Sequence, residues 1–223
     1  MADEKNFSVD TEQLKNETKD TVNQVKEQIK NTDFKKDAEA TKGFIKEMFV
    51  SPFEAIKKVA TGEENVLSKA IIIMIIFIAA SVLYTIISLM KYGKYSKFGD
   101  NLLSLVASVL NPAFYIAVPA IIVLIFNRTN KKSLITVITT LIVTSVPVVV
   151  NEVVSLITIL VSGASIITSP VSTMLLAVST VLTYFGMKYI FEEEDDAKFI
   201  KTFAIIKLLA AFVLVILGRI GIY

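Results

Sequence analysis

The sequence predicts an all-α integral membrane bundle of about five transmembrane helices, preceded by a charged, partly helical and amphipathic cytosolic N-terminal arm. Three observations lead to this prediction. Hydrophobic residues make up 53% of the 223 residues, and the mean hydropathy is +0.62. Charge gathers at the start, since residues 1–69 hold 12 Lys and Arg and 14 Asp and Glu, whereas the other 154 residues hold 11 and 7. Apolar runs long enough to cross a bilayer follow the charged segment.

A helix that crosses the hydrocarbon core of a bilayer needs about 20 apolar residues, because the core is about 30 Å thick and each residue rises about 1.5 Å. The run from Ala70 to Met90 contains no charged residue and is the clearest span. An uncharged helix of this length inside a soluble protein would need apolar partners on every side. The other predicted spans cover residues 102–126, 134–161, 171–190 and 200–220.

Three prolines lie inside the predicted spans, at Pro112, Pro119 and Pro147. Proline is tolerated in membrane helices where neighbouring groups satisfy the carbonyl that it frees, so we expect helix kinks at these positions. Residues 134–161 are too many for a simple crossing and too few for two. They form either one long tilted helix or a helix that ends near Val150 and continues as an interfacial or re-entrant segment. We count them as one crossing.

Basic residues predict the orientation of the bundle, because an excess of Lys and Arg marks the cytoplasmic face. If the N-terminus is inside, the inner flanks carry nine basic residues: Lys57, Lys58, Lys69, Arg128, Lys131, Lys132, Lys188, Lys198 and Lys201. The outer flanks then carry four: Lys91, Lys94, Lys97 and Arg219. The prediction is a multi-pass protein of the cell membrane with its N-terminus in the cytoplasm and its C-terminus outside.

Residues 1–50 form the charged arm. Residues 9–31 have a helical pattern that Asp10 is suited to cap, with apolar or small positions at Leu14, Thr18, Val22, Val25 and Ile29. A stripe this narrow buries little surface, and an isolated helix of this length is marginal in water. Two interpretations stay open: a partly disordered or fraying solvated helix, or a short coiled-coil or membrane-surface element that orders on contact. Residues 1–50 are in either case the candidate contact for a protein partner.

Residues 51–62 predict a short amphipathic helix beside the first span. Ser51, Pro52 and Glu54 are typical of a helix start, and Gly62 of a helix end. Apolar side chains line one face and lysines another, a pattern that suits the headgroup layer of a membrane. The candidate interfacial anchors are Phe53, Ile56, Lys57 and Lys58. The alternative is a cytosolic helix packed against the inner loops of the bundle.

The composition disfavours enzymatic chemistry. The chain has no His and no Cys, which removes the usual proton-transfer residues of intramembrane proteases as well as thiol catalysis and zinc-thiolate sites. We predict no catalytic residue, no cofactor and no metal site. The acidic run from Glu192 to Asp196 lacks the alternation of a calcium loop, and we interpret it as a solvated hairpin. A net charge of +2 gives no field suited to nucleic acid.

Polar residues inside the spans are the remaining site candidates, because charges at membrane depth are costly. The candidates are Asn151, Glu152 and Lys207. We expect Lys207 to extend toward the inner interface, and Glu152 either to cap an outer helix end or to form a polar cavity with Asn151 and nearby hydroxyls. The many Ser and Thr residues of the third and fourth spans are expected to bond across helices or to their own carbonyls.

With this layout established, the chain resembles bacterial members of the Yip1 family of small multi-spanning membrane proteins. The resemblance begins at the proline-aromatic segment from Ser51 to Lys58 and continues through the basic loop 127–133, Pro147 and the closing pair of spans from Pro170. It covers roughly residues 51–223. The resemblance implies a cytosolic N-terminus, five spans, no catalytic centre, and a role in membrane organisation or partner recruitment.

Three functions follow from these observations. The first is a non-enzymatic membrane scaffold, whose arm recruits a protein partner or lies on the inner leaflet. The bundle anchors the arm, and the scaffold is either a single chain or a homo-oligomer. The second is a small solute or ion carrier with a polar pathway at Glu152. The third, an intramembrane enzyme, is the least favoured. The bilayer is the expected lipid partner in all three, and nucleic acid is not expected.

Overall fold

The computed structural model describes residues 11–31, 33–63, 66–92, 98–127, 132–161 and 165–219. The ordered elements in these ranges are all helices: α1 (Thr11–Asn31), α2 (Phe34–Val50), α3 (Pro52–Thr61), α4 (Leu67–Tyr92), α5 (Phe98–Phe126), α6 (Leu134–Thr144), α7 (Val146–Leu160), α8 (Ser165–Phe191) and α9 (Asp196–Arg219). The predictions made for Asp10, Lys94, Lys97, Arg128 and Lys131 concern residues outside the described ranges.

The all-α membrane bundle is confirmed. In the described part of the chain, α4, α5, α8 and α9 are each long and apolar enough to cross a bilayer. α6 and α7 together form a fifth apolar unit that is bent by 41°. The protein is therefore a multi-pass membrane protein. α5 runs without interruption through Pro112 and Pro119, and the kinks expected at these two prolines stay a prediction.

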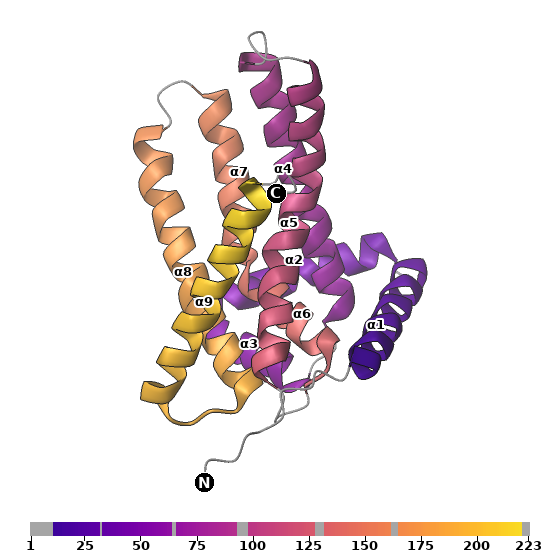
Figure 1. The fold of residues 1–223 in the computed structure, drawn as a ribbon. Coiled ribbons are helices and arrows are strands. Elements are labelled where there is room, and N and C mark those ends of the chain that lie inside the picture. The colour runs from indigo at the N-terminus through magenta and orange to yellow at the C-terminus, as the bar shows by residue number, and fades with distance from the viewer. Residues whose placement is uncertain are drawn as a thin grey trace.

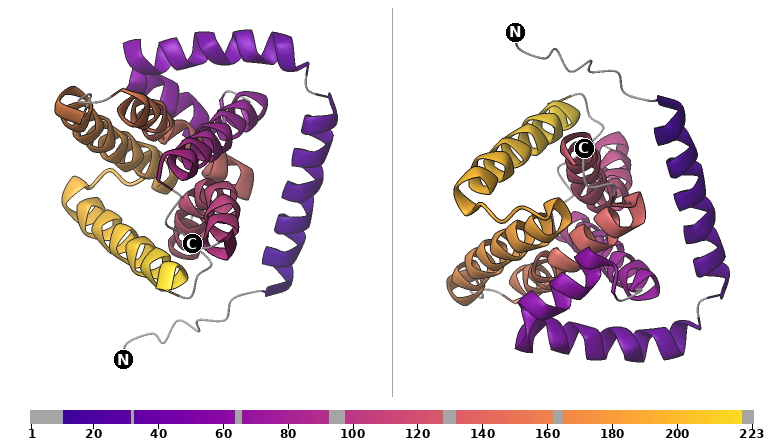
Figure 2. Two further views of the ribbon diagram at one scale, coloured as in Figure 1. Left: turned by 90° about the horizontal axis from the view of Figure 1, so that it is seen from above. Right: turned by 90° about the horizontal axis from the view of Figure 1, so that it is seen from below.

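The helices are arranged as antiparallel neighbours with the arm at one end (Figure 1). α4 packs against α5 and α7, α7 against α8, and α9 chiefly against α5. The view along the bundle shows α1 and α2 following two adjacent sides of it (Figure 2). α3 lies between α6 and α8 at the end where α8 finishes and α9 begins. We call this end of the bundle the arm end.

The helix at residues 52–61 begins and ends where predicted, but most of its apolar face is buried within the protein. Pro52 opens α3 and Gly62 closes it with a φ of 80°, although the Ser51 side chain makes no capping hydrogen bond. Ile56 is 0% exposed because α3 packs against α6 and α8. Ile56 is therefore a core residue instead of the expected interfacial anchor. Phe53 remains 44% exposed, and Lys57 and Lys58 are exposed.

α3, α6 and α8 meet at a glycine. A Cβ added to Gly186 would lie 2.9 Å from the Cγ2 atoms of both Thr140 and Thr144, and 3.4 Å from Cγ2 of Ile56. Glycine at this position allows α8 to approach α6 closely, as small residues do at the interfaces of membrane helices. Because Gly186 has no side chain, α3, α6 and α8 can pack together at this one point.

Replacement of Gly186 by alanine should destabilise the protein by about 1–3 kcal/mol, because the added methyl group overpacks a contact between β-branched side chains. Thermal unfolding of the purified protein in detergent measures this. Gly43→Ala in α2 is the matched control, since nothing lies within 4 Å of its added Cβ. That variant should be neutral or more stable by up to about 1 kcal/mol. Equal stability of Gly186→Ala and the native protein would contradict the close packing.

Candidate functional site

The third span is broken at Ser145. α6 ends at Thr144, α7 begins at Val146, and Pro147 lies in the first turn of α7. Proline has no backbone N–H, so the carbonyl four residues before Pro147 loses its helical partner and the ring pushes the chain out of line. The break therefore follows from Pro147. The sequence left open one long tilted helix or a helix that ends near Val150, and the structure has neither, because the break is at Ser145 and Val150 lies inside α7.

Backbone groups at the break find other partners. The N–H of Val148 and the N–H of Val149 both donate to the carbonyl of Ser145, at 2.8 and 3.1 Å. The hydroxyl of Ser145 donates to the carbonyl of Ile142 at 2.7 Å. The carbonyl of Thr144 accepts from the hydroxyl of Ser179 on α8 at 3.0 Å. α8 thus stabilises the bend by supplying a donor that α7 does not provide.

A cavity of about 180 Å³ lies beside this break, between α5, α6, α8 and α9. Its polar lining consists of Tyr115, Thr144, Ser145, Thr183 and Lys207. The rest of the lining is apolar, and so is most of the exposed surface of the cavity; Lys207 is the one charged residue in the lining that the structure describes. We call this space the Lys207 cavity.

Lys207 extends along its own helix toward the arm end. Its Nζ lies 5.8 Å from the ring centroid of Phe203, one helical turn earlier in α9. This is the direction expected for a lysine that brings its ammonium group toward the membrane surface. The backbone of Lys207 is about 10 Å along the helix from Ile200, the first apolar residue of the predicted span. The ammonium group therefore lies nearer to the arm end of the bundle than the backbone of Lys207 does.

Asn151 and Glu152 lie elsewhere, on the far side of the break along α7. The Lys207 cavity is lined by neither of them, so the structure does not bring the two charged candidates together. Glu152 is half-buried, and the amide oxygen of Asn151 is buried with no hydrogen-bond partner among the described residues.

The hydroxyls expected to form a polar cavity with Glu152 are engaged in other contacts. Ser155 donates to the carbonyl of Asn151 at 2.9 Å. Thr158 donates to the carbonyl of Val154 at 3.1 Å and lies 2.6 Å from the hydroxyl of Thr168 on α8. These contacts stabilise α7 and its packing on α8, and they leave the hydroxyl protons committed to protein acceptors.

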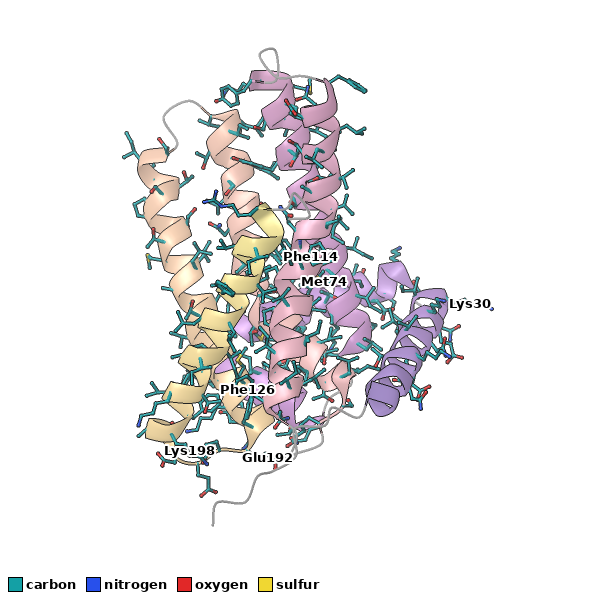
Figure 3. The ribbon with its side chains drawn as sticks, in the orientation of Figure 1. Lys30, Met74, Phe114, Phe126, Glu192 and Lys198 are labelled. Atoms are coloured by element: carbon teal, nitrogen blue, oxygen red, sulfur yellow. The ribbon has the colours of Figure 1, made fainter. Side chains whose placement is uncertain are left out.

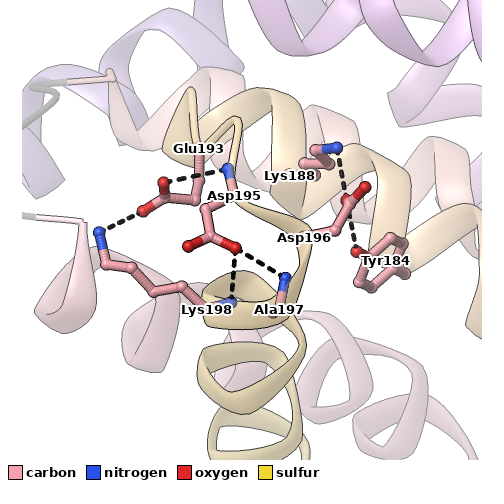
Figure 4. A network of polar contacts seen from close by, with 7 residues as sticks. All are labelled: Tyr184, Lys188, Glu193, Asp195, Asp196, Ala197 and Lys198. Carbon is pink, nitrogen blue, oxygen red and sulfur yellow. Dashed lines mark hydrogen bonds and ion pairs between the residues drawn. The ribbon is translucent and has the colours of Figure 1, made fainter.

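The acidic run between α8 and α9 is a cluster of contacts that joins helix ends (Figure 4). Asp196 accepts from Lys188 at 2.6 Å and from the Tyr184 hydroxyl at 3.1 Å. Asp195 accepts from the N–H groups of Ala197 and Lys198 at the start of α9, at 2.9 and 3.2 Å, which is the geometry of a helix N-cap.

Two further pairs extend this cluster. Glu193 pairs with Lys198 at 2.6 Å, and Glu192 pairs with Lys132 before α6 at 2.7 Å. Glu192 and Lys198 both lie at the arm end of the bundle (Figure 3). No group of three or more acidic residues in the described part of the chain is placed to hold a metal ion. The run is largely exposed, as expected for a solvated hairpin, and its side chains also join helix ends; we call these contacts the acidic clip.

Hydrogen bonding lowers the pKa of Glu193. The ammonium group of Lys198 is the main cause, and the N–H of Asp195 adds to it. A carboxyl whose pKa is lower in the folded protein than in the unfolded chain adds stability above the unfolded pKa. That stability is lost as the pH falls through the lower, folded value. The lowered pKa of Glu193 therefore predicts that the protein becomes less stable at acidic pH, in part because the contact between Glu193 and Lys198 is lost.

The thermal stability of the native protein should fall as the pH drops from about 5 toward 3, the range in which carboxylates ordinarily titrate. Glu193→Gln should show a shallower fall over this range, because it has no carboxylate to protonate. The measurement is apparent Tm against pH in detergent. Glu194→Gln is the matched control, since Glu194 is exposed and lies outside the clip contacts; it should follow the native profile. Identical profiles for Glu193→Gln and the native protein would contradict this role.

The sequence identifies the Ser and Thr residues of this region, but it does not predict which groups their hydroxyls bond to. Most of them donate to their own helix, as Thr139, Thr140 and Thr183 do. Among the described residues, three of these Ser and Thr hydroxyl contacts cross between helices: the Ser179 hydroxyl donates to the carbonyl of Thr144, the Thr183 hydroxyl lies 3.5 Å from that of Thr144, and the Thr158 hydroxyl lies 2.6 Å from that of Thr168. The sequence did not predict the cavity, because its lining comes from four helices. Apolar runs do not show which sides of these helices face one another. Lys207, a charged residue in the interior of the predicted span 200–220, was the available signal.

Comparison with known proteins identifies no relative: no family model, no curated protein and no solved structure matches the chain.

Proposed function

We propose that the protein is a non-enzymatic membrane scaffold of the Yip1-like type, which holds α1 beside its membrane domain as a docking helix for a protein partner. The observation that carries this proposal is the way the arm joins the bundle. α2 and α3 contribute Phe44, Met48, Ile56 and Val59 to the buried core. Because α2 and α3 are part of the core, they form a fixed platform to which α1 is connected. A helix that recruits a partner needs such a fixed position.

The outer surface of α1 is suited to a partner. Its exposed polar residues include Lys19, Asp20, Asn23, Gln24, Lys26, Glu27 and Lys30, and Lys30 points away from the bundle (Figure 3). Among them Val22 and Ile29 are 44% and 47% exposed. Apolar residues seven apart, flanked by charges, form the kind of stripe by which a helix packs into a groove or against another helix.

The charge of α1 favours a protein partner over the lipid surface. The segment from Thr11 to Asn31 contains four lysines and four acidic residues. Helices that bind anionic membrane surfaces are rich in Lys and Arg on their polar face, and α1 has no such excess. Alternating charges are typical of contacts in which both partners carry both signs.

The other candidate functions have less support. The chain has no His or Cys, which argues against an intramembrane enzyme. A carrier pathway through Glu152 needs polar groups free to bind a solute, and Ser155 and Thr158 donate to acceptors within the protein. The Yip1-like assignment is supported by the layout of the chain: the proline-led α3 before the first span, Pro147 in the third, and the closing helix pair.

Photo-crosslinking in cells tests the scaffold proposal. A photoreactive amino acid replaces Val22 or Ile29, and adducts are identified by mass spectrometry. We expect the same protein adduct from both positions. Reversing the neighbouring charges with Lys26→Glu and Lys30→Glu should lower its yield severalfold, because the mixed-charge contact then opposes like charges. The amount of protein in the membrane should not change.

The matched control places the same photoreactive group at Leu208 on α9, which is 71% exposed and lies on a span. That position should give lipid adducts and not the protein captured from α1. The scaffold proposal fails if Val22 and Ile29 give no protein adduct, or only the adducts that Leu208 gives.

A further inference from the structure

The Lys207 cavity contains a cation without an anion. No carboxylate lines it, and within the described ranges no ion pair involves Lys207; its charged group has the Phe203 ring as neighbour. A cation–π contact compensates only part of the cost of an ammonium group that has left bulk water. A charge at membrane depth is a functional hypothesis by default. The cavity therefore favours an anionic ligand.

The hydroxyls around the cavity narrow the chemistry of that ligand. Thr144 donates to the carbonyl of Leu141 at 3.1 Å, Ser145 to that of Ile142 at 2.7 Å, and Thr183 to that of Ser179 at 2.7 Å. Each hydroxyl has a single hydrogen and two acceptor lone pairs. With the hydrogens committed to carbonyls, these oxygens can only accept a hydrogen bond from a ligand. A matching ligand has an anionic group for Lys207 and O–H donors for the hydroxyl oxygens.

The position of the cavity indicates where such a ligand comes from. Lys207 extends toward the arm end, and its backbone is about 10 Å from the first apolar residue of α9. Because the predicted span begins at Ile200, a side chain that extends from Lys207 toward the arm end brings its ammonium group close to the predicted edge of the hydrocarbon core, next to the layer of lipid phosphates and glycerol groups. Basic pockets between membrane helices at this depth bind lipid headgroups.

We propose that the Lys207 cavity binds a phosphate ester that carries free hydroxyl groups, the chemistry of a glycerol phosphate, with Lys207 on the phosphate and the oxygens of Thr144, Ser145 and Thr183 accepting from the hydroxyls. The same chemistry occurs in phosphatidylglycerol and in soluble glycerol 3-phosphate. This binding site does not depend on whether α1 recruits a partner.

Binding is measured on the full-length protein in a neutral detergent, by native mass spectrometry and by the rise in apparent Tm. The probes are phosphatidylglycerol, phosphatidylcholine, phosphatidic acid and glycerol 3-phosphate. Phosphatidylglycerol should bind and stabilise the native protein, and phosphatidylcholine, which has no net charge and no headgroup hydroxyl, should not. If glycerol 3-phosphate binds as tightly as phosphatidylglycerol, the source is the soluble ester and the site stands; if it does not, the source is the lipid.

Substitutions separate this site from general lipid binding. Lys207→Met should weaken phosphatidylglycerol binding by about tenfold or more, the loss expected for a hydrogen bond to a charged group, and Lys207→Arg should restore most of it. Lys201→Met is the control on the same helix, since Lys201 is exposed and outside the cavity; it should bind as the native protein does.

Thr183→Val tests the hydroxyl half of the site. It should weaken phosphatidylglycerol more than phosphatidic acid, which has no headgroup hydroxyl. If Lys207→Met is not recovered in folded form, Lys207→Gln provides the same comparison. Equal affinity of phosphatidylglycerol for the native protein and for the Lys207 variant that folds, or equal binding of phosphatidylcholine and phosphatidylglycerol, would overturn the proposal.

Discussion

Everything in this bundle depends on how the broken third span satisfies its backbone inside a medium that supplies no water. An unpaired carbonyl in hydrocarbon costs several kcal/mol, so irregular backbone persists there only where the protein provides the donors. Pro147 removes the helical donor of the Val143 carbonyl, and the N–H of Val148 turns from Thr144 to the carbonyl of Ser145. The hydroxyl of Ser179 on α8 supplies the carbonyl of Thr144 with a donor in its place. The bend of 41° between α6 and α7 is thus a feature of two helices together. Neither α6 nor α7 alone is long enough to cross a bilayer.

The same junction organises what surrounds it. Gly186, two turns after Ser179 on α8, lets Thr140, Thr144 and Ile56 pack together, so α3, which follows the arm, joins the core at Thr144, the last residue before the break. On the other side, Thr144 and Ser145 line the cavity that Lys207 enters from α9. A change in the bend would therefore shift both the platform that carries α1 and the geometry of the cavity. The ion pairs of the acidic clip also join the last turns of α8 to the start of α9.

Sequence patterns were sufficient for the elements whose environment is uniform. The uncharged run from Ala70 to Met90 lies within α4, because a helix that crosses lipid must be apolar over its whole length. Pro52 and Gly62 delimit α3, because proline and glycine act through local backbone geometry. The patterns were insufficient where a residue depends on a distant partner. Ile56 belongs to a face that suits a membrane surface as well as a protein core, and only the contact with α6 and α8 decides between them. The break at Ser145 and the Lys207 cavity likewise need the positions of α8 and α9.

The most direct test of the central claim is the unfolding free energy of Ser179→Ala, measured in detergent beside Thr180→Val. Thr180 is exposed on the same helix, and its hydroxyl donates at 3.0 Å to a carbonyl of α8 itself. Ser179→Ala should lose about 1 kcal/mol, since it leaves the carbonyl of Thr144 without its donor, whereas Thr180→Val should lose almost nothing. Equal stability of Ser179→Ala and the native protein would contradict the claim that α8 supports the break.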